Sequence, residues 1–356
     1  MTEATFTGTV TIDGTAHQVT ADLTMTTAAP PPGPGSCPTG YTWSATQTGA
    51  AGEIAATGGT GWCELVPAGG GGGGGGGGQG AGQCYFGIWD PLSVNWNTAD
   101  GNPVGTWQGA AKFSAAPVKS VSYFDAWLGP FPTVLDTLAG QHNGTVYLNL
   151  EPWNTWGNGP TPKMTDIAKG SADSYLTSIG NAIKAGGNDV WVTFAHEMNG
   201  TWYPWGIQAV TPAQWVAAWK HVCDVIRAAA GGHAKMVWCP NNNDVGPVTP
   251  YWPGDDYVDI AGFDSYLNQD SASQTYATWT AKTVAEIRAT GTTKPLWNAE
   301  SGVNPGTNRA QRYTQFINDM HSDGLLGFTQ WNEGSFALTT AEIAAVCQAV
   351  NAWNAG

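Results

Sequence analysis

Eight short apolar runs, separated by segments with helical periodicity, follow one another from residue 84 to the end of the chain. Each run has the length of a strand, and most end at or directly before a polar or aromatic residue. The runs are Cys84–Trp89, Val121–Phe124, Val146–Leu150, Val190–Ala195, Met236–Cys239, Val258–Phe263, Pro295–Ala299 and Leu326–Gln330. Eight strands that alternate with helices predict an α/β fold, a (β/α)8 TIM barrel, which typically needs about 250 residues. A doubly wound open sheet is the alternative.

Two of the intervening segments carry start signals for helices. Thr211 precedes Pro212 at the beginning of a segment whose apolar residues lie on one face. Thr339 and Glu342 form a capping box before the last segment. Helices at these places fit the crossover connections that parallel strands require.

A small β-rich region is expected before the barrel. Residues 1–27 alternate between apolar and polar residues around Asp13-Gly14, which is the short-range signal for a β-hairpin. An isolated hairpin is marginal in water, so this segment is expected to anchor on a partner or on the rest of the chain. Residues 28–67 combine a Pro-rich linker with a small β module, in which Cys37 and Cys63 are placed to form a disulfide.

Ten consecutive glycines, Gly69–Gly78, lie within residues 68–83. A glycine run of this kind is a flexible tether. It predicts a boundary between the N-terminal region, residues 1–67, and a barrel domain at residues 84–356. An assembly partner for residues 1–67 is a further expectation.

The charge balance restricts the classes of partner. The chain has 27 acidic and 13 basic residues, a formal net charge of −14, which repels phosphate backbones and anionic lipids. Nucleic acid and membrane surfaces are therefore not expected as partners. Only 11% of residues are charged whereas 19 are tryptophan, which favours a flat, polar, uncharged ligand unless the indoles simply fill the core. The first residues, Met1–Phe6, lack the basic and apolar regions of a secretory signal.

Motifs for metal and cofactor chemistry are missing from the sequence. There is no C-x-x-C pair, and the six histidines are scattered. His196-Glu197 begins like a zinc-protease helix, but Gly200 stands where the second histidine is required. No G-x-S-x-G elbow of an esterase is present. We expect neither a metal nor an organic cofactor.

Carboxyl groups and aromatic rings follow the predicted strands. They are Glu151 and Trp153 after the third strand, His196, Glu197, Trp202 and Trp205 after the fourth, Tyr266 after the sixth, Glu300 after the seventh, and Trp331 and Asn332 after the eighth. In a TIM barrel these positions converge on the C-terminal face, where the reactive residues lie. Lysine and arginine are nearly absent from the set, although a phosphate- or carboxylate-bearing substrate would require them.

Two carboxyls across an uncharged, aromatic cleft suit the cleavage of a glycosidic bond. One must be protonated so that the leaving oxygen can depart, and the other must be ionised so that it can attack the anomeric carbon. Glu197, flanked by Trp202 and Trp205, suits the acid with a raised pKa. Glu300, within reach of the Tyr266 hydroxyl, suits the ionised nucleophile.

Three segments resemble glycoside hydrolase family 26. His196–Gly200 with Trp202–Gly206 resembles its acid/base segment, Tyr251–Tyr266 its sixth-strand segment, and Lys294–Gly302 its nucleophile strand. The resemblance implies a retaining endo-glycosidase that acts on a polysaccharide, with β-mannan as the first choice. It also implies the roles of the rim residues: Glu197 as acid/base, Glu300 as nucleophile, Tyr266 orienting Glu300, His196 supporting Glu197, and Trp202 and Trp331 as sugar platforms.

Two positions depart from the family pattern. Asn332 stands where family mannanases commonly have an arginine, and Glu151 stands where they tend to have a histidine. Both touch substrate contacts, so mixed-linkage β-glucan, xylan or a bacterial surface glycan remain open as substrates. A glycan-binding virion tail or surface protein is the alternative from another class. We expect the protein to be extracellular, or associated with a virion or cell surface.

Overall fold

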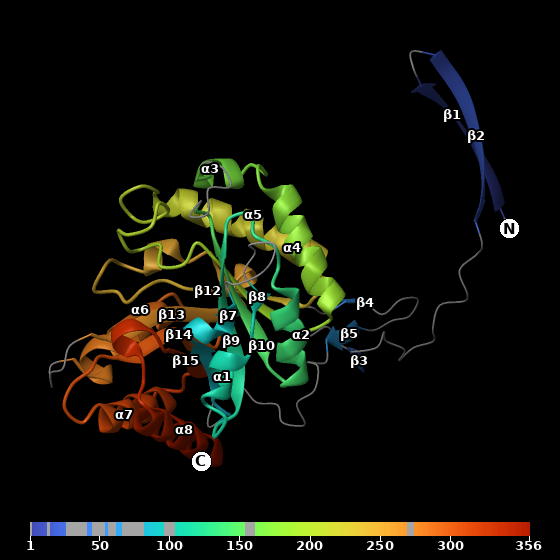
Figure 1. The fold of residues 1–356 in the computed structure, drawn as a ribbon. Helices are drawn as coiled ribbons and strands as arrows, with labels where there is room; N and C mark the ends of the chain where they lie inside the picture. The colour runs from blue at the N-terminus through green and yellow to red at the C-terminus, as the bar shows by residue number, and fades with distance from the viewer. Residues whose placement is uncertain are drawn as a thin grey trace. The chain divides into compact units, whose positions relative to one another are not determined.

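The computed structural model describes residues 2–12, 15–25, 41–44, 54–55, 62–65, 82–95, 104–153, 161–268 and 274–356. Its contacts divide the chain into two compact units, Met1–Gly77 and Gly78–Gly356. Figure 1 shows the strands and helices of both units.

The first unit is built from short antiparallel sheets. β1 (Thr2–Ile12) pairs with β2 (Thr15–Met25) along their whole length, where the alternation predicts a hairpin. β3 (Tyr41–Ser44), β4 (Ile54–Ala55) and β5 (Trp62–Leu65) form a second sheet in the order β3-β5-β4. Cys37 lies outside the described residues, so the disulfide with Cys63 stays a prediction, as does the assembly role of residues 1–67.

Eight parallel strands of the second unit close into a barrel. They are β6 (Tyr85–Trp89), β9 (Val118–Ala126), β10 (Thr145–Glu151), β11 (Val190–Phe194), β12 (Ala234–Trp238), β13 (Ile260–Leu267), β14 (Leu296–Val303) and β15 (Gly327–Trp331). The last strand pairs with the first from Gly327–Tyr85 to Trp331–Trp89. The predicted (β/α)8 barrel is therefore confirmed, and the open sheet is excluded. Between β6 and β9, the short strands β7 (Val94–Asn95) and β8 (Val104–Gly105) pair antiparallel.

Helices alternate with the barrel strands (Figure 1). They are α1 (Gln108–Ala111), α2 (Thr133–Gln141), α3 (Met164–Ile167), α4 (Asp173–Gly186), α5 (Pro212–Ala230), α6 (Ala281–Arg288), α7 (Arg309–Ser322) and α8 (Thr340–Ala355). Capping boxes at Thr211 and Thr339 begin α5 and α8, as the sequence predicts. Short 3-10 turns lie at Pro91–Ser93, Thr249–Tyr251, Asp255–Tyr257 and Gly334–Phe336, and a π-helical turn at Tyr276–Thr280.

Aromatic rings fill the barrel interior near the start of its strands. The Tyr85 ring stacks on Trp191 with 3.9 Å between centroids, and the Trp297 ring meets Trp191 edge-on at 4.9 Å. Tyr147 packs edge-on against Trp297 as well. This end of the barrel is a packed core, so chemistry is confined to the opposite end, where the strands finish.

The described tryptophans of this unit differ in exposure. Trp215, Trp219, Trp238 and Trp297 are fully buried, whereas Trp202 is exposed. Cys84, Cys223, Cys239 and Cys347 are buried free thiols. Among the described helices, none combines the length and apolar character needed to cross a membrane.

Candidate active site

Four carboxyl groups gather where neighbouring strands of the barrel end. Glu151 ends β10, Glu197 follows β11, Asp264 lies in β13, and Glu300 lies in β14. Asp264 and Glu300 face each other in the register of β13 and β14. Glu197 and Glu300 are only 8% and 7% exposed. The C-terminal face thus holds a cluster of buried acids.

The Tyr266 hydroxyl contacts Glu300. It donates a hydrogen bond of 2.7 Å to Glu300 Oε2. Burial raises the pKa of Glu300 well above its ordinary value, and the charge of Glu197 raises it further, while the bond from Tyr266 lowers it. The Tyr266 hydroxyl therefore favours the ionised form of Glu300, whereas burial and the charge of Glu197 disfavour it.

Glu197 accepts two side-chain hydrogen bonds. The Asn241 amide donates to Glu197 Oε1, and the Trp202 indole N–H donates to Oε2 at 2.6 Å. Burial raises the pKa of Glu197, and both donors lower it. Trp202 therefore acts on the acid as a polar donor, whereas the sequence suggested an apolar neighbour.

The two carboxyls lie in more similar surroundings than the sequence analysis expects. Burial raises the pKa of both Glu197 and Glu300, so neither is kept ionised by its surroundings alone. Because the charge of Glu197 raises the pKa of Glu300, ionisation of one carboxyl disfavours ionisation of the other. Such a pair holds one acid and one base at the same pH.

Glu197 is presented by a strained backbone. Ala195 and Glu197 have φ values of 50° and 52°, in the left-handed region, at a cost of about 1–3 kcal/mol each. The indole of Trp215 donates to the Ala195 carbonyl at 3.1 Å. The indole of Trp205 donates to the His196 carbonyl at 2.6 Å. These buried bonds, with that from the Glu197 N–H to the Cys239 carbonyl at 2.7 Å, hold the turn in place.

His196 lies between the third and fourth strand ends. It is 2% exposed, and its Nε2 is 3.6 Å from Glu151 Oε1. Burial lowers the pKa of His196 to about 3, so its imidazole is neutral. Burial and the charge of Glu197 raise the pKa of Glu151 to about 7. The position of His196 next to Glu197 is compatible with support of the acid, which stays a prediction.

Aromatic rings lie beside these acids at the C-terminal ends of the strands. Trp202 is 45% exposed, and Trp331 is half-buried with its ring 5.2 Å from that of Trp89. Phe124 lies 5.7 Å from both Trp331 and His196. Trp153, also half-buried, meets the Tyr203 ring edge-on at 5.6 Å. Exposed aromatic faces of this kind can stack on sugar rings.

Two of the expected substrate contacts are buried and hydrogen-bonded within the protein. Trp205 is 1% exposed, because its ring stacks on Tyr203 and its N–H binds the His196 carbonyl. Asn332 is 5% exposed, because its amide donates to Asp90 and accepts the Leu338 N–H. Both residues support the neighbouring backbone, and their role as substrate contacts stays a prediction.

Four residues of the site were missing from the expected set: Phe124, Tyr203, Asn241 and Asp264. Phe124 lies near the end of β9, Asn241 follows β12, and Asp264 lies in β13. Applied to all eight strands, the strand-end rule selects these three residues. Tyr203 lies between Trp202 and Trp205, which the rule did select, but its contact with Trp153 depends on the course of the loop after β11.

One group of side chains in the described part of the chain has the residue types of a metal site. His196, Asp264 and Glu300 each offer one donor atom, and these atoms lie within 4.8 Å of one another. Asp264 is completely buried, and burial raises its pKa well above the ordinary value. Because burial disfavours the charged form of Asp264, the group suits acid–base chemistry.

Comparisons with known proteins agree with this geometry. A sequence model described as glycosyl hydrolase family 26 matches residues 174–302. Endoglucanase H of Acetivibrio thermocellus is 30% identical over 210 residues, which are 55% of this chain and 22% of that protein. A mannan endo-1,4-beta-mannosidase of Bifidobacterium adolescentis is 25% identical over 135 residues, 36% of this chain and 13% of that protein. The aligned part is therefore less than a quarter of the length of these relatives.

A solved structure shares the fold. A modular endo-beta-1,4-mannanase from Cellulomonas fimi superposes with a TM-score of 0.55 at 16% identity, over 77% of this chain and 71% of that one. The matched family segment, residues 174–302, contains both Glu197 and Glu300.

Proposed function

Because the barrel belongs to glycoside hydrolase family 26, we propose that this protein is an endo-β-glycosidase that hydrolyses a neutral β-linked polysaccharide. The pair of buried carboxyls, Glu197 and Glu300, beside exposed aromatic rings is the observation that carries the proposal. A cleft of acids and indoles suits an uncharged polymer, since sugar rings stack on aromatic faces.

The proposed mechanism is double displacement with retention of configuration. Glu300 attacks the anomeric carbon while Glu197 gives its proton to the leaving oxygen, which forms a covalent glycosyl-enzyme. Glu197, now ionised, takes a proton from water, and the hydroxide equivalent displaces Glu300. Tyr266 supports the first step, because its hydrogen bond favours the ionised form of Glu300.

β-Mannan is the first choice of substrate. The name of the Bifidobacterium relative and that of the Cellulomonas structure support it. The name of the Acetivibrio relative favours a β-glucan instead. Asn332 in place of an arginine and Glu151 in place of a histidine keep xylan and bacterial surface glycans among the candidates. Because such polymers lie outside cells, we place the protein outside the cell or on a virion or cell surface.

A reducing-sugar assay on mannan, lichenan, xylan and bacterial wall polysaccharides tests the proposal. The wild type should release sugar from one of them, with NMR of the first product reporting the retained anomer. Glu300→Ala should abolish release. A 2-deoxy-2-fluoro glycoside of the active sugar should label Glu300. An inverted first product would rule out the double displacement.

Sugar binding without turnover is the second candidate function, in which the β-rich region at residues 1–67 would anchor the protein in an assembly. The same panel separates the two, because a pure binding protein would retain polysaccharide in a pull-down and release no sugar. Retention by the wild type and Glu300→Ala alike, without release by either, would favour binding.

A further inference from the structure

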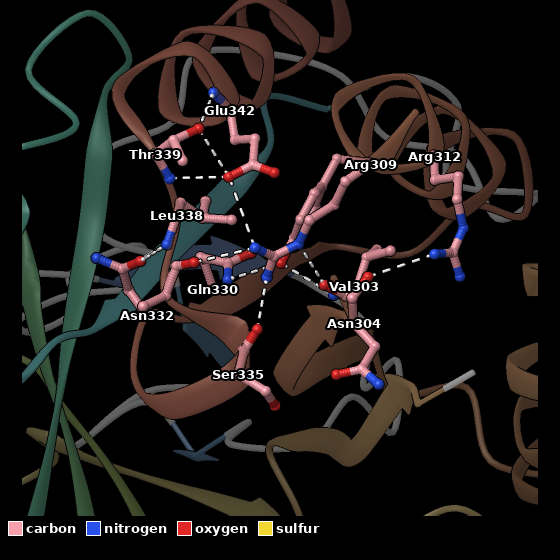
Figure 2. Close-up of polar contacts among 12 residues, drawn as sticks. Val303, Asn304, Arg309, Arg312, Gln330, Asn332, Ser335, Leu338, Thr339 and Glu342 are labelled. Atoms are coloured by element: carbon pink, nitrogen blue, oxygen red, sulfur yellow. Dashed lines mark hydrogen bonds and ion pairs between the residues drawn. The ribbon is translucent and has the colours of Figure 1, made fainter. Parts of the chain in front are cut away.

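Arg309 is a buried cation at the start of α7. It is 7% exposed, and its Nε donates to the Val303 carbonyl at the end of β14 at 2.7 Å. Its two remaining nitrogens each donate at 3.0 Å, Nη1 to the Ala337 carbonyl and Nη2 to the Ser335 carbonyl. Glu342 lies 3.5 Å from Nη1. Arg309 thus ties the strand that carries Glu300 to the segment after β15 (Figure 2).

Phe336 lies between the two carbonyls that Arg309 binds. Its own N–H donates to the Glu333 carbonyl at 3.0 Å, which closes the 3-10 turn Gly334–Phe336. Because Ser335 and Ala337 are both anchored, the backbone of Phe336 has little freedom to move.

The Phe336 ring lies over the strands that carry Tyr266 and Glu300. Its centroid is 4.7 Å from that of the Tyr266 ring, with 38° between the planes. A Cβ added to Gly302 would lie 2.5 Å from Phe336 Cδ1, so the ring rests directly on the Gly302 backbone. Gly302 and Tyr266 are partners in the register of β14 and β13. The Phe336 ring therefore packs against both β13, at Tyr266, and β14, at Gly302.

We propose that Phe336, fixed by Arg309, is a positioning residue that holds the Tyr266 ring where its hydroxyl donates to Glu300. The proposal rests on the proposed function, which makes Glu300 the nucleophile. The contacts among Arg309, Phe336 and Tyr266 do not depend on which substrate is bound. Arg309 and Phe336 lie outside the expected set of site residues, and neither touches the reacting atoms in this assignment.

The effect should be measurable at Glu300 itself. The titratable groups that face Glu300 from neighbouring elements are Tyr147, Glu151, His196, Glu197, Tyr203, Cys239, Asp264 and Tyr266. Of these, Tyr266 donates to the Glu300 carboxylate and lowers its pKa. Without Phe336 the Tyr266 ring can move, which weakens this hydrogen bond. The midpoint of the Glu300 titration should then rise by roughly 0.5–1 pH unit, the equivalent of one net hydrogen bond.

The test is a titration of the full chain labelled with carboxyl-13C glutamate and followed by NMR. The chain has nine glutamates, and Glu300→Gln identifies the Glu300 signal. Phe336→Ala should raise the midpoint in the wild type and leave it unchanged in Tyr266→Phe, which already lacks the bond. This double-mutant cycle distinguishes an effect transmitted by Tyr266 from an effect of water that enters where the Phe336 ring was. Such water would shift the Glu300 midpoint in both backgrounds.

A second variant and a control complete the experiment. Gly302→Ala pushes the Phe336 ring away without removing it, so it should raise the midpoint as well. Leu338→Ala truncates a half-buried residue of the same loop and should leave the midpoint within error. Equal shifts of Phe336→Ala in both backgrounds, or no shift in either, would overturn the proposal.

Failure of the proposed function would look different. The NMR titration needs no turnover, so it reports on Phe336 even if no polysaccharide is cleaved. Labelling of Glu300 by the 2-fluoro glycoside tests the nucleophile independently of Phe336. If Phe336→Ala shifts the Glu300 midpoint only when Tyr266 is present, and Glu300 is not labelled, the positioning role stands and the proposed reaction is rejected. If Glu300 is labelled but Phe336→Ala has no effect that depends on Tyr266, the reaction stands and the positioning role is rejected.

Discussion

At the residue scale, two tryptophans three positions apart have opposite roles. Trp202 is 45% exposed and donates to Glu197, whereas Trp205 is 1% exposed and donates to the backbone of His196. The sequence marks both as aromatic residues after a strand, but it contains no signal for the direction of either ring. That direction depends on the left-handed residues of the loop, Ala195 and Glu197, which only the folded chain reveals.

Replacement of Trp202 by Phe should change the pH dependence of turnover. The indole N–H lowers the pKa of Glu197, so its loss raises that pKa and extends the protonated acid to higher pH. The alkaline limb of kcat/KM should therefore move upward. Trp331→Phe is the matched control, because Trp331 lies against Trp89. An alkaline limb that moves equally in both variants would contradict the role of the indole.

Removal of the acid should be tolerated by substrates with good leaving groups. Glu197→Ala should lose most activity on polysaccharide but keep the first step on aryl glycosides, because their departure needs no proton. Azide should then accelerate the second step and give a glycosyl azide of retained configuration. Glu197→Gln serves as the isosteric control. Equal losses on both substrates, with no response to azide, would assign the acid elsewhere.

At the scale of elements, the fold was readable because each barrel strand is a short apolar run. All eight runs overlap strands, from β6 to β15. The ends were less exact: β13 extends to Leu267 because Asp264 and Ser265 are both buried, with Asp264 bound to Cys239 and Ser265 to Thr280. The positions of Glu197 and Glu300 followed from the strand ends. Contacts set by loops did not, as Tyr203 and the Phe336 turn illustrate.

The loop after β11 should depend on Trp205 for both stability and turnover. Trp205→Phe leaves the His196 carbonyl without its buried donor, which should cost about 1–3 kcal/mol of unfolding free energy. The kcat should also fall, because the strained turn that presents Glu197 loses support. Trp219→Phe is the control, since that buried indole donates to the Tyr257 carbonyl. Denaturation and kcat of both variants decide the matter, and an unchanged kcat in Trp205→Phe would refute it.

At the scale of the whole molecule, hydrogen bonds join the segment that precedes the barrel to its last helix. The Cys84 N–H donates to Asn354 at 2.6 Å, and the Trp353 indole donates to the Gly82 carbonyl at 3.2 Å. Both bonds join the segment before β6 to the end of α8. The unit Gly78–Gly356 therefore contains the closed barrel, the four carboxyls and the contacts that fix both of its termini.

A fragment that starts at Gly78 should consequently fold and keep full activity without residues 1–77. Ten glycines offer no side chain with which to bind two units together, so removing what precedes them should leave the melting temperature of the barrel unchanged. A fragment that starts at Cys84 is the informative comparison. It lacks the Gly82 carbonyl that accepts from Trp353, and it should melt earlier by the loss of about 0.5–1.5 kcal/mol. Calorimetry and the polysaccharide assay on both fragments measure this, and an insoluble Gly78 fragment would make residues 1–77 part of the barrel's core.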